Sequence, residues 1–233
     1  MKVIISGYGR MGHEIENIAL SRGHEIVAKI DLGQSWDSVP DCDVIIDFTT
    51  AEAAPVIAQI AFNKRIAFVS GTTGWNSRLN EIKEIARSEG RTFFYASNFS
   101  IGANIFFSLN KKLASFLKNN KEYSAHIHEI HHIHKKDAPS GTAITLAEDI
   151  ISESNQYSRW TSHDNDSGLK ISSERIGEIP GTHIVNWQSE VDEIEIKHTA
   201  HSRKGLALGA VIAAEWVLGK KGVFGMKDLL SID

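Results

Sequence analysis

Five histidines lie close together in the middle of the chain, and basic residues follow them directly. The histidines are His126, His128, His131, His132 and His134. Lys135, Lys136 and Asp137 come next. Imidazole and ammonium groups at this density can bind anions and exchange protons near neutral pH. Three interpretations compete for the segment: a metal site, a strand surface that merely tolerates imidazoles, and a patch for anion binding and acid–base catalysis.

A metal site would need ligands that converge from one face, with an acid or a thiolate to complete the shell. The segment has no His-Glu-x-x-His motif, and the only cysteine, Cys42, lies 84 residues before His126. We therefore expect no metal site here. The plain strand surface remains an alternative.

Side chains alternate between the two faces of a strand, which constrains how these histidines can cooperate. His131 should share a face with Glu129, and His132 should lie on the opposite face. The two imidazoles can therefore reach one pocket only if the strand ends there. The sequence predicts such an end, because Lys135–Pro139 reads as a loop.

A helix N-terminus follows this loop and could complete an anion site. Ser140 is a suitable cap, and the next residues are apolar at helical spacing. The N–H groups of Gly141 and Thr142, with the Thr142 hydroxyl, would then face an anion. Among so many cationic groups we expect Lys135 to release its proton more easily than a free lysine. Anion binding with acid catalysis, acting on a small carboxylate, is the favoured interpretation.

A second motif lies at the start of the chain, where a glycine turn follows a short β-prone run. Gly7 permits a tight turn, Gly9 lets the backbone approach a pyrophosphate, and Gly12 lets a helix lie close to the strand. Tyr8, Arg10 and Met11 complete the loop. The context of strand, turn and helix predicts a dinucleotide site. An ordinary βα turn, in a fold that binds another nucleotide or none, is the alternative.

Asp31 lies 19 residues after Gly12, at the end of the second predicted strand. Its carboxylate is suited to the ribose 2′-hydroxyl of NAD, and Leu32 beside it offers no cation for a 2′-phosphate. Arg10 could still attract a phosphate. We therefore expect NADH to be preferred and leave NADPH open.

Two further loops follow later strands of the same predicted sheet, where ligands gather at strand carboxyl ends. One is Gly71-Thr72-Thr73-Gly74, whose hydroxyls and bare backbone could line a nicotinamide pocket; a plain turn is the alternative. The other is Ala96-Ser97-Asn98-Phe99. Both are expected to contact the cofactor.

Strands and helices alternate through the first part of the chain. Apolar strand-like runs are found at 2–6, 25–30, 44–48, 66–70 and 92–96, with helical stretches between them at about 11–19, 52–63 and 78–88. Strands that are apolar on both faces predict a parallel sheet covered on both sides. We expect a Rossmann-type α/β dinucleotide domain formed by 1–98 and 204–233.

The pattern changes after Asn98. A helix is expected with apolar positions Ile105, Leu109, Leu113 and Phe116. The runs 182–187 and 193–198 alternate in polarity, which predicts an antiparallel sheet with one wet face. The polar stretch 152–173 should be a long mobile connection, and the nearly all-apolar helix 205–218 should be buried. We expect 99–203 to be a smaller α+β domain, with a mostly antiparallel or mixed sheet, for substrate binding and oligomerisation.

Composition limits the classes of protein. The chain has 233 residues, 42% hydrophobic and 23% charged, as in ordinary globular proteins. A net charge of −4 argues against a partner among nucleic acids or membrane surfaces. The longest apolar run, 206–218, is too short for a membrane span. A single cysteine and the absence of a basic-then-apolar leader point to the cytoplasm.

Several of these segments together resemble one enzyme family. Gly-x-Gly-Arg-Met-Gly at 7–12, the loop 71–74, Asn98-Phe99-Ser100 and above all the run from Glu129 to Ala143 resemble the 4-hydroxy-tetrahydrodipicolinate reductase family, long called dihydrodipicolinate reductase. Motifs at 175–183 and 198–203 occur in the family's order. The resemblance implies an NAD(P)H-dependent oxidoreductase of lysine and diaminopimelate biosynthesis. It implies hydride transfer to 4-hydroxy-tetrahydrodipicolinate, a cyclic dicarboxylate, which loses water and becomes tetrahydrodipicolinate.

The resemblance also implies roles for individual residues. His131 matches the proposed acid–base residue and Lys135 the proton donor, while His132, Gly141 and Thr142 match contacts to the substrate carboxylate. The implied cofactor contacts are Gly7, Tyr8, Gly9, Arg10, Met11, Gly12, Asp31, Gly71, Thr72, Thr73, Ala96, Ser97, Asn98 and Phe99. The family is usually tetrameric, through the sheet of the second domain, so a homotetramer is implied as well.

Two departures from the family pattern bear on the cofactor. The family often has an arginine where this chain has Leu32, which agrees with a preference for NADH. The interval from Asp31 to Asp43 is short, and a helix or strand should be missing there. Other classes stay open from the residues alone: another two-domain nicotinamide dehydrogenase, a non-catalytic dinucleotide sensor and a zinc hydrolase.

Overall fold

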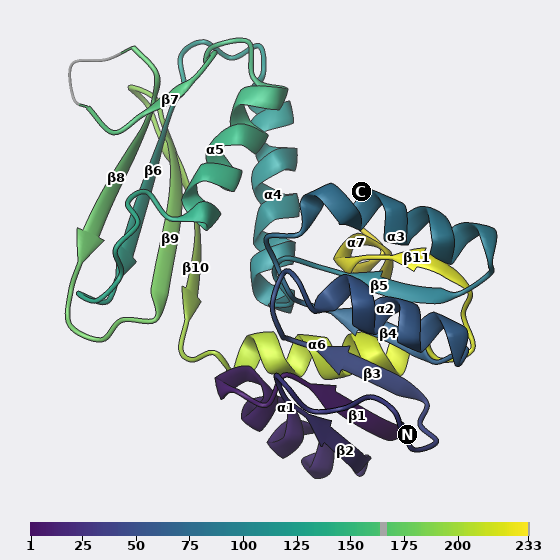
Figure 1. Ribbon diagram of the computed structural model, residues 1–233. Helices are drawn as coiled ribbons and strands as arrows, with labels where there is room; N and C mark the ends of the chain where they lie inside the picture. Colours follow the sequence, from purple (N-terminus) through teal and green to yellow (C-terminus); the bar gives the residue numbers. More distant parts are fainter. Residues whose placement is uncertain (164–166, 233) are drawn as a thin grey trace. The chain divides into compact units, whose positions relative to one another are not determined.

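The computed structural model describes residues 1–163 and 167–232, which form two compact units (Figure 1). One unit consists of Met1–Ile101 and the chain from Lys204 onward, and the other of Gly102–Arg203. The second unit is therefore inserted between two segments of the first.

The first unit is built on a six-stranded sheet in the order β11-β5-β4-β3-β1-β2. The strands are β1 (Lys2–Ser6), β2 (Glu25–Ile30), β3 (Val44–Asp47), β4 (Ala67–Ser70), β5 (Thr92–Tyr95) and β11 (Gly222–Phe224). All neighbouring strands are parallel, so their carboxyl ends meet at one edge. The loops that begin at residues 7, 31, 48, 71 and 96 follow that edge.

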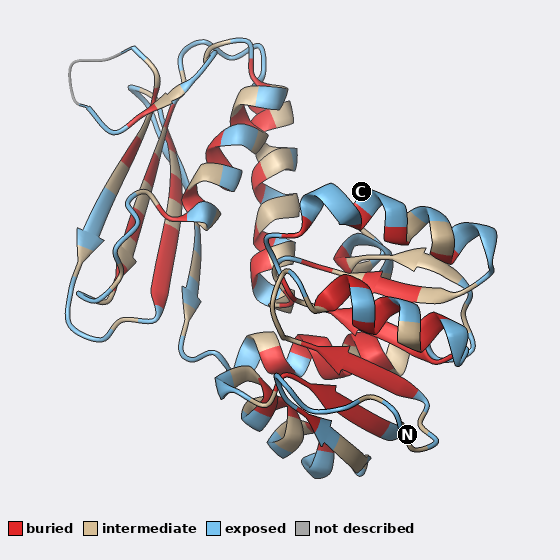
Figure 2. Ribbon diagram, viewed as in Figure 1, coloured by how far each residue is buried: buried red, intermediate tan, exposed pale blue. Residues whose placement is uncertain are grey.

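Helices cover both faces of this sheet, as expected for strands that are buried on both sides (Figure 2). The helices are α1 (Arg10–Ser21), α2 (Ala54–Asn63), α3 (Asn76–Ser88), α6 (Lys204–Val217) and α7 (Met226–Leu230). Alternate residues of each strand face opposite cores. Val3 and Ile5 pack with residues of α1 and α6, whereas Ile4 packs with residues of α2 and α3.

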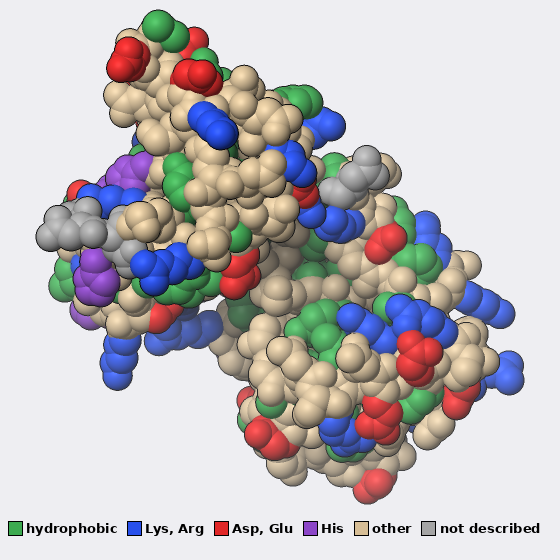
Figure 3. Space-filling model, turned by 90° about the horizontal axis from the view of Figure 1, so that it is seen from above, with side chains coloured by type: hydrophobic (Ala, Val, Ile, Leu, Met, Phe, Trp, Pro, Cys, Tyr) green, Lys and Arg blue, Asp and Glu red, His purple; other side chains and the backbone are tan. Residues whose placement is uncertain are grey.

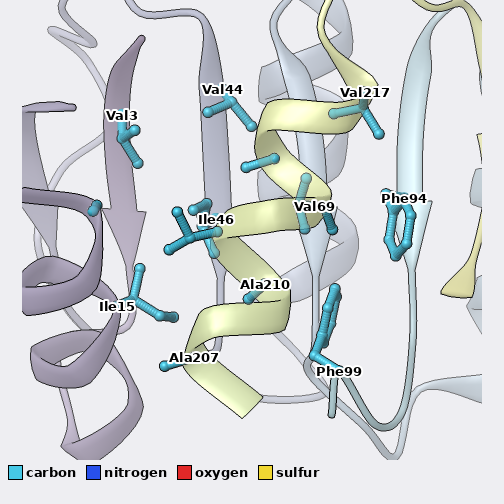
Figure 4. Close-up of a cluster of buried hydrophobic side chains, with 14 of the residues drawn as sticks. Val3, Ile15, Val44, Ile46, Val69, Phe94, Phe99, Ala207, Ala210 and Val217 are labelled. Carbon is cyan, nitrogen blue, oxygen red and sulfur yellow. The ribbon is translucent and has the colours of Figure 1, made fainter. Parts of the chain in front are cut away.

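Helix α6 lies close against the sheet because its contacting residues are small (Figure 4). Ala207, Ala210 and Val217 pack among Val44 and Ile46 of β3 and their neighbours. Gly209 faces Phe99 so closely that a Cβ would lie 1.8 Å from its carbonyl oxygen. The buried helix predicted at 205–218 is confirmed with bounds one residue earlier.

The segment between β2 and β3 contains no helix or strand. Residues 31–43 run directly from one strand to the other, past β1, which pairs with both. The expectation that the short interval lacks an element is confirmed.

The second unit has a five-stranded sheet in the order β10-β9-β6-β8-β7. Its strands are β6 (Ser124–His131), β7 (Trp160–Thr161), β8 (Leu169–Arg175), β9 (Gly181–Gln188) and β10 (Glu193–Ala200). β9 pairs antiparallel with β6 and β10, whereas β8 pairs parallel with β6 and β7. The sheet is therefore mixed.

Two helices, α4 (Ile101–Leu117) and α5 (Gly141–Glu153), pack on one face of this sheet. The helix expected after Asn98 is present as α4, but three of the four apolar positions named for it are exposed. Ile105, Leu109 and Phe116 are exposed, and the buried residues are Ala103, Phe106, Asn110, Ala114 and Leu117. The Asn110 amide donates to the Leu146 carbonyl at 3.0 Å, so a polar residue lies on the contact stripe.

The long connection predicted at 152–173 is also wrong in part. It contains the end of α5, strand β7 and the start of β8, while residues 164–166 lie outside the described residues. Leu169 and Ile171 alternate with polar residues and are buried. β8 forms because it pairs with β6, although its polar composition did not indicate a strand.

Among the residues that the structure describes, none of the helices is long and apolar enough to cross a membrane. Figure 3 shows acidic and basic side chains interspersed on the face seen from above, with histidines beside basic side chains at the left. That mixture agrees with the small net charge of −4.

Candidate functional site

The glycine turn has the geometry of an anion-binding loop. Gly7 has a positive φ of 84°, and a Cβ there would lie 2.3 Å from the Phe48 carbonyl oxygen. A Cβ on Gly12 would lie 2.4 Å from the Gly7 carbonyl oxygen, whereas Gly9 has nothing within 4 Å of the same position. Gly7 and Gly12 thus allow close packing, and Gly9 leaves open space for a ligand.

The first turn of α1 begins at this loop with its N–H groups available. Gly9 is the N-cap, with no side-chain cap and no acidic residue in the first turn. Arg10 is exposed beside it, and Met11 is half-buried. Free N–H groups and the positive end of the helix dipole suit a pyrophosphate.

Asp31 lies at the end of β2 next to this loop. Its Oδ1 accepts hydrogen bonds from the N–H groups of Tyr8 at 3.3 Å and Leu32 at 2.9 Å. The Tyr8 ring is held by Lys29, whose Nζ donates to the Tyr8 hydroxyl at 3.1 Å and pairs with Glu16 at 2.6 Å. Asp31 is therefore fixed against the glycine turn, with its other oxygen turned away from those two donors.

A cavity of about 210 Å³ opens beside Asp31. Its apolar walls include Leu32 and Trp36 from the short 31–43 segment and Val56 and Ile57 from α2. A flat, largely apolar ring system fits such walls. The residues of this edge therefore suit a dinucleotide: N–H groups for phosphates, a carboxylate for a ribose and an apolar pocket for a base.

The loop after β4 is tied to a buried carboxylate that sequence reasoning did not single out. Asp47, at the end of β3, is fully buried and accepts hydrogen bonds from the hydroxyls of Thr49 at 2.6 Å, Ser70 at 2.8 Å and Thr72 at 2.8 Å. Burial raises the pKa of Asp47, against the lowering effect of these hydroxyls. An acidic residue that ends an otherwise apolar strand was the available signal.

The Thr72 hydroxyl therefore makes its hydrogen bonds with other residues of the protein. It donates to Asp47 and accepts from the N–H of Thr49 at 2.8 Å. Gly71 lies so close to the Phe48 ring that a Cβ would approach it to 2.3 Å. The Thr72 hydroxyl is therefore turned inward rather than toward a ligand, and the exposed Thr73 is the freer of the two threonines.

The loop after β5 also combines residues that are buried with residues that are accessible. Ala96 and Phe99 are buried, and the Phe99 ring packs near Phe94 and Phe48, with centroids 5.6 and 5.7 Å away. Ser97 is exposed and Asn98 is half-buried. Side-chain contacts to a cofactor can come from Ser97 and Asn98, whereas Ala96 and Phe99 can offer only backbone.

In the second unit, β6 ends at His131, as predicted. The buried members of the strand alternate and include Ile127, Glu129 and His131. His131 packs edge-on against His183 of β9, with ring centroids 5.0 Å apart. Burial lowers the pKa of His131 to about 4, although Glu129 opposes that shift.

Glu129 is fully buried beside His131. Burial would raise its pKa, but the neighbouring groups of His183, Ser140, Ser173 and Arg175 together hold the pKa well below its usual range. Glu129, His131 and His183 bring three possible metal-binding atoms within 4.8 Å of one another. The Arg175 guanidinium, 3.1 Å from the same carboxylate, supplies the positive charge there.

His132 lies just past the strand end, with its ring 5.9 Å from that of His134. Its Nδ1 is buried and has no hydrogen-bond partner within the described chain. His134 itself is exposed and pairs with Glu178 at 2.9 Å.

The surroundings of Lys135 differ from the cluster of cations that the sequence led us to expect. Its Nζ donates to both oxygens of Asp137 at 2.8 Å, so the nearest charged group is an anion. The hydrogen bond from Lys135 lowers the pKa of Asp137. The expectation of easier proton release rested on cationic neighbours, whereas the group that contacts the Lys135 Nζ is a carboxylate.

Helix α5 begins as predicted, with Ser140 as its N-cap. The Ser140 hydroxyl accepts from the Ala143 N–H at 3.2 Å, which leaves the N–H groups of Gly141 and Thr142 in the first turn. Gly141 has open space around it. The unit thus presents imidazoles, an ammonium and a helix N-terminus within one stretch of chain, a combination suited to binding a carboxylate and moving a proton.

Comparisons with known proteins agree for both units. Two family models match the chain: dihydrodipicolinate reductase, N-terminus, over residues 1–99, and dihydrodipicolinate reductase, C-terminus, over residues 102–230. A 4-hydroxy-tetrahydrodipicolinate reductase of Christiangramia forsetii is 46% identical over 234 residues, covering 99% of this chain and 98% of that protein. One of Methanosarcina barkeri is 36% identical over 262 residues, covering 98% of each.

Solved structures share the fold. The dipicolinate-bound dihydrodipicolinate reductase from Paenisporosarcina sp. TG-14 superposes with a TM-score of 0.81 at 22% identity, covering 97% of each chain. A myo-inositol 2-dehydrogenase from Lactobacillus plantarum gives a TM-score of 0.60 at 11% identity, covering 99% of this chain and 93% of that one.

Proposed function

The chain belongs to the dihydrodipicolinate reductase family, and on that premise we propose how its residues divide the work of reducing 4-hydroxy-tetrahydrodipicolinate. As a member it is an oxidoreductase that uses a nicotinamide dinucleotide. Its reaction belongs to lysine and diaminopimelate biosynthesis. The match of both halves to one family favours this activity over a dehydrogenase of another pathway, a dinucleotide sensor or a zinc hydrolase.

The first unit binds the dinucleotide at the carboxyl edge of its sheet. The N–H groups at the N-terminus of α1 and the open space at Gly9 would hold the pyrophosphate, and the Asp31 carboxylate would accept a hydrogen bond from the ribose. Leu32 and Trp36, which line the adjoining cavity, would contact the adenine. When bound, the reduced nicotinamide supplies the hydride. Ser97, Asn98 and Thr73 have the side chains best exposed to contact it.

The second unit binds the dicarboxylate and handles its protons. The N–H groups of Gly141 and Thr142 and the ring of His132 bind a substrate carboxylate. Lys135 exchanges its partner Asp137 for the substrate and donates a proton, and His131 takes part in acid–base chemistry through the ring nitrogen that Glu129 does not face. The observation that supports this proposal is that β6 ends at His131 and is linked to the N-cap of α5 by the hydrogen bond from the Ser140 N–H to Glu129, with Lys135 in the loop between.

Replacement of the two proton-transfer residues tests the assignment. We expect His131→Ala and Lys135→Ala to lower kcat by ~10² or more while the Kd of NADH stays the same, as for a lost general acid or base. Steady-state kinetics with substrate generated in situ, and fluorescence titration of NADH, give the two quantities. Lys136→Ala, next to Lys135 and exposed, is the control. Wild-type turnover in both variants would remove the catalytic roles.

NADH should be preferred over NADPH. The Asp31 carboxylate binds a 2′-hydroxyl and repels a 2′-phosphate, and Leu32 supplies no compensating cation. Asp31→Ala should weaken NADH binding about tenfold, because an exposed charged hydrogen bond contributes ~1.5 kcal/mol. It should also bring the kcat/KM values for NADH and NADPH closer together. Asp41→Ala, in the same segment, is the control. An unchanged ratio would mean that Asp31 does not select the cofactor.

We also propose that the protein acts in the cytoplasm as a homotetramer, as the family resemblance implies. The exposed Ile194 of β10 and Val191 before it support an association surface on the second unit. Light scattering on the purified protein tests the tetramer. A monomeric mass across the micromolar range would exclude it.

A further inference from the structure

The buried carboxylate of Glu129 has two oxygens in different surroundings. Glu129 precedes His131 by two residues on β6, so both side chains lie on the same face of the strand. An inference about this pair rests on the proposed function, because it concerns the histidine assigned there to acid–base chemistry.

Three donors hold one oxygen of the carboxylate. Oε1 accepts from the backbone N–H of Ser140 at 3.0 Å, the hydroxyl of Ser173 at 2.8 Å and the guanidinium of Arg175 at 3.1 Å. The donors come from the cap of α5 and from β8. Arg175 also donates to the Asp137 carbonyl at 2.6 Å. Glu129 is therefore held in one orientation by the elements around it.

The other oxygen faces only imidazoles. Oε2 lies 3.3 Å from Nδ1 of His131 and 3.7 Å from Nε2 of His183. Oε2 and His131 Nδ1 are both buried, and neither has a hydrogen-bond partner within the described chain. An ionised oxygen left without a donor in a buried site is costly, so one of the two rings must supply a proton to it.

The neighbours of His183 decide between the two rings. The Ser140 Oγ, which accepts from the Ala143 N–H, lies 3.1 Å from His183 Nε2. We infer that the Ser140 hydroxyl is the donor in this contact, which leaves His183 Nε2 without a proton of its own. The Nδ1–H of His131, the closer ring, remains as the donor to Glu129.

We propose that Glu129 is a positioning residue that accepts a hydrogen bond from the Nδ1–H of His131 and so fixes the tautomer with an unprotonated Nε2. Nδ1 is fully buried, so a substrate can approach the ring only from the opposite edge, which carries Nε2. A Cβ on Gly181 would lie 3.0 Å from Nε2, so a side chain at that position would crowd this edge of the ring. His131 therefore enters the reaction with an Nε2 that can accept the carbon-bound proton released when the substrate loses water, while Lys135 gives its proton to the departing hydroxyl.

The charges around the ring agree with a neutral imidazole. Glu129 from β6 favours the cation, while His183 from β9, Arg175 from β8 and Lys135 from the following loop oppose it. Desolvation adds to that opposition, and the pKa of His131 falls to about 4. At neutral pH the ring is uncharged, so the position of its one proton determines what it can do.

Glu129→Gln tests the proposal because the same three donors would orient the new amide. Ser140, Ser173 and Arg175 all donate and would hold the amide oxygen, which turns the NH₂ group toward His131 Nδ1. That group donates, so Nδ1 must accept and the proton moves to Nε2. The variant keeps the shape of the side chain and reverses the tautomer.

Two measurements follow. Long-range ¹H–¹⁵N spectra of the histidine rings at pH 7.5, with His131 assigned from a His131→Asn variant, should give protonated Nδ1 in the wild type and protonated Nε2 in Glu129→Gln. The kcat should fall by ~10², with the KM for the dicarboxylate and the Kd of NADH changing less than ~3-fold, because a proton acceptor is lost rather than a binding group. Glu174→Gln is the matched control, since Glu174 lies 3.5 Å from His128 in the same sheet. It should leave the His131 signals and kcat unchanged.

A protonated Nε2 in the wild-type ring would overturn the proposal, and so would a Glu129→Gln variant with wild-type signals and kcat. If the variant does not fold, the wild-type spectrum alone decides. A failure of the proposed function can be told apart from a failure of this proposal, because the spectra report the tautomer of His131 even in a protein that has no reductase activity.

Discussion

Two fully buried carboxylates lie on strands of the two sheets, and their donors set them apart. Asp47 accepts from hydroxyls, and burial raises its pKa. Glu129 accepts from a guanidinium, a backbone N–H and a hydroxyl, and its pKa is lowered in spite of burial. Burial alone therefore does not determine ionisation; the hydrogen bonds and charges around each carboxylate also do. Asp47 organises a loop, whereas Glu129 carries a fixed negative charge beside a histidine.

Asp47→Asn should destabilise the first unit and loosen the loop after β4. An amide has one acceptor oxygen for three hydroxyls, so at least one buried hydroxyl loses its partner, at a cost of ~1–3 kcal/mol. The free energy of unfolding from urea titration gives the loss, and NADH binding should weaken with it. Asp37→Asn is the control, because Asp37 is exposed and accepts one hydroxyl. Equal stability of the two variants would contradict the role of Asp47.

His131 should make the second unit less stable in acid. Its pKa in the folded chain is about 4, against ~6.5 when unfolded, so between these values the unfolded chain binds a proton that the folded chain does not. Stability is then fully present above pH ~6.5 and declines toward pH ~4, by about 3 kcal/mol at most. Urea titrations at pH 7.5, 6.0 and 4.5 measure the slope. His131→Asn should flatten it, and the exposed His201→Asn should not; equal slopes in all three proteins would exclude His131 as the cause.

The sequence was a better guide to residues that act through their backbone or their charge than to the side chains with which those residues pair. Gly7 and Gly12 show the close packing expected from their spacing, and Gly9 has open space beside it, since such features depend on local geometry. The inward turn of Thr72 and the pairing of Lys135 with Asp137 depend on neighbours that spacing does not specify. The carboxylate of Glu129 was visible, but its donors come from β8 and α5, which only the folded sheet brings near.

At the scale of elements, apolar spacing predicted where the helices lie but does not identify which of their residues are buried. Residues 105, 109 and 116 of α4 are exposed, whereas Phe106, Ala114 and Leu117 pack in the core of the second unit. Strand β8 was missed because its sequence is polar apart from Leu169 and Ile171. Helices that bury small residues, and strands held by neighbours on both sides, are hidden from a hydrophobicity pattern.

Helix α6 offers a test of packing between elements. Gly209→Ala should destabilise the first unit by more than ~3 kcal/mol, because the new Cβ would lie 1.8 Å from the Phe99 carbonyl oxygen and the helix would have to move. Gly205→Ala in the same helix is the matched control, since the nearest atom to its Cβ position is 3.9 Å away. Thermal unfolding compares the two. A Gly209→Ala variant as stable as the Gly205→Ala variant would mean that α6 is not held so closely.

At the scale of the whole molecule, the chain leaves the first unit after Ile101 and returns to it at Lys204. Each unit has its own core and its own set of chemistry-bearing residues. The N-terminus of α1 and Asp31, proposed to hold the dinucleotide, belong to one, and His131, Lys135 and the N-terminus of α5, proposed to bind and protonate the substrate, belong to the other. Binding of the two ligands should therefore be separable by mutation, although turnover needs both.

Calorimetric titrations of single variants test that separation. Asp31→Ala should weaken NADH about tenfold and leave the Kd of dipicolinate, used as a dicarboxylate probe without nucleotide, within ~2-fold of wild type. His132→Ala should do the reverse, because its imidazole serves only the carboxylate. In the double variant, each of the two losses of affinity should equal the loss in the single variant, because mutations at sites that share no partners have additive free-energy effects. A loss of dipicolinate binding in Asp31→Ala would show instead that the nucleotide edge contributes directly to the dicarboxylate site.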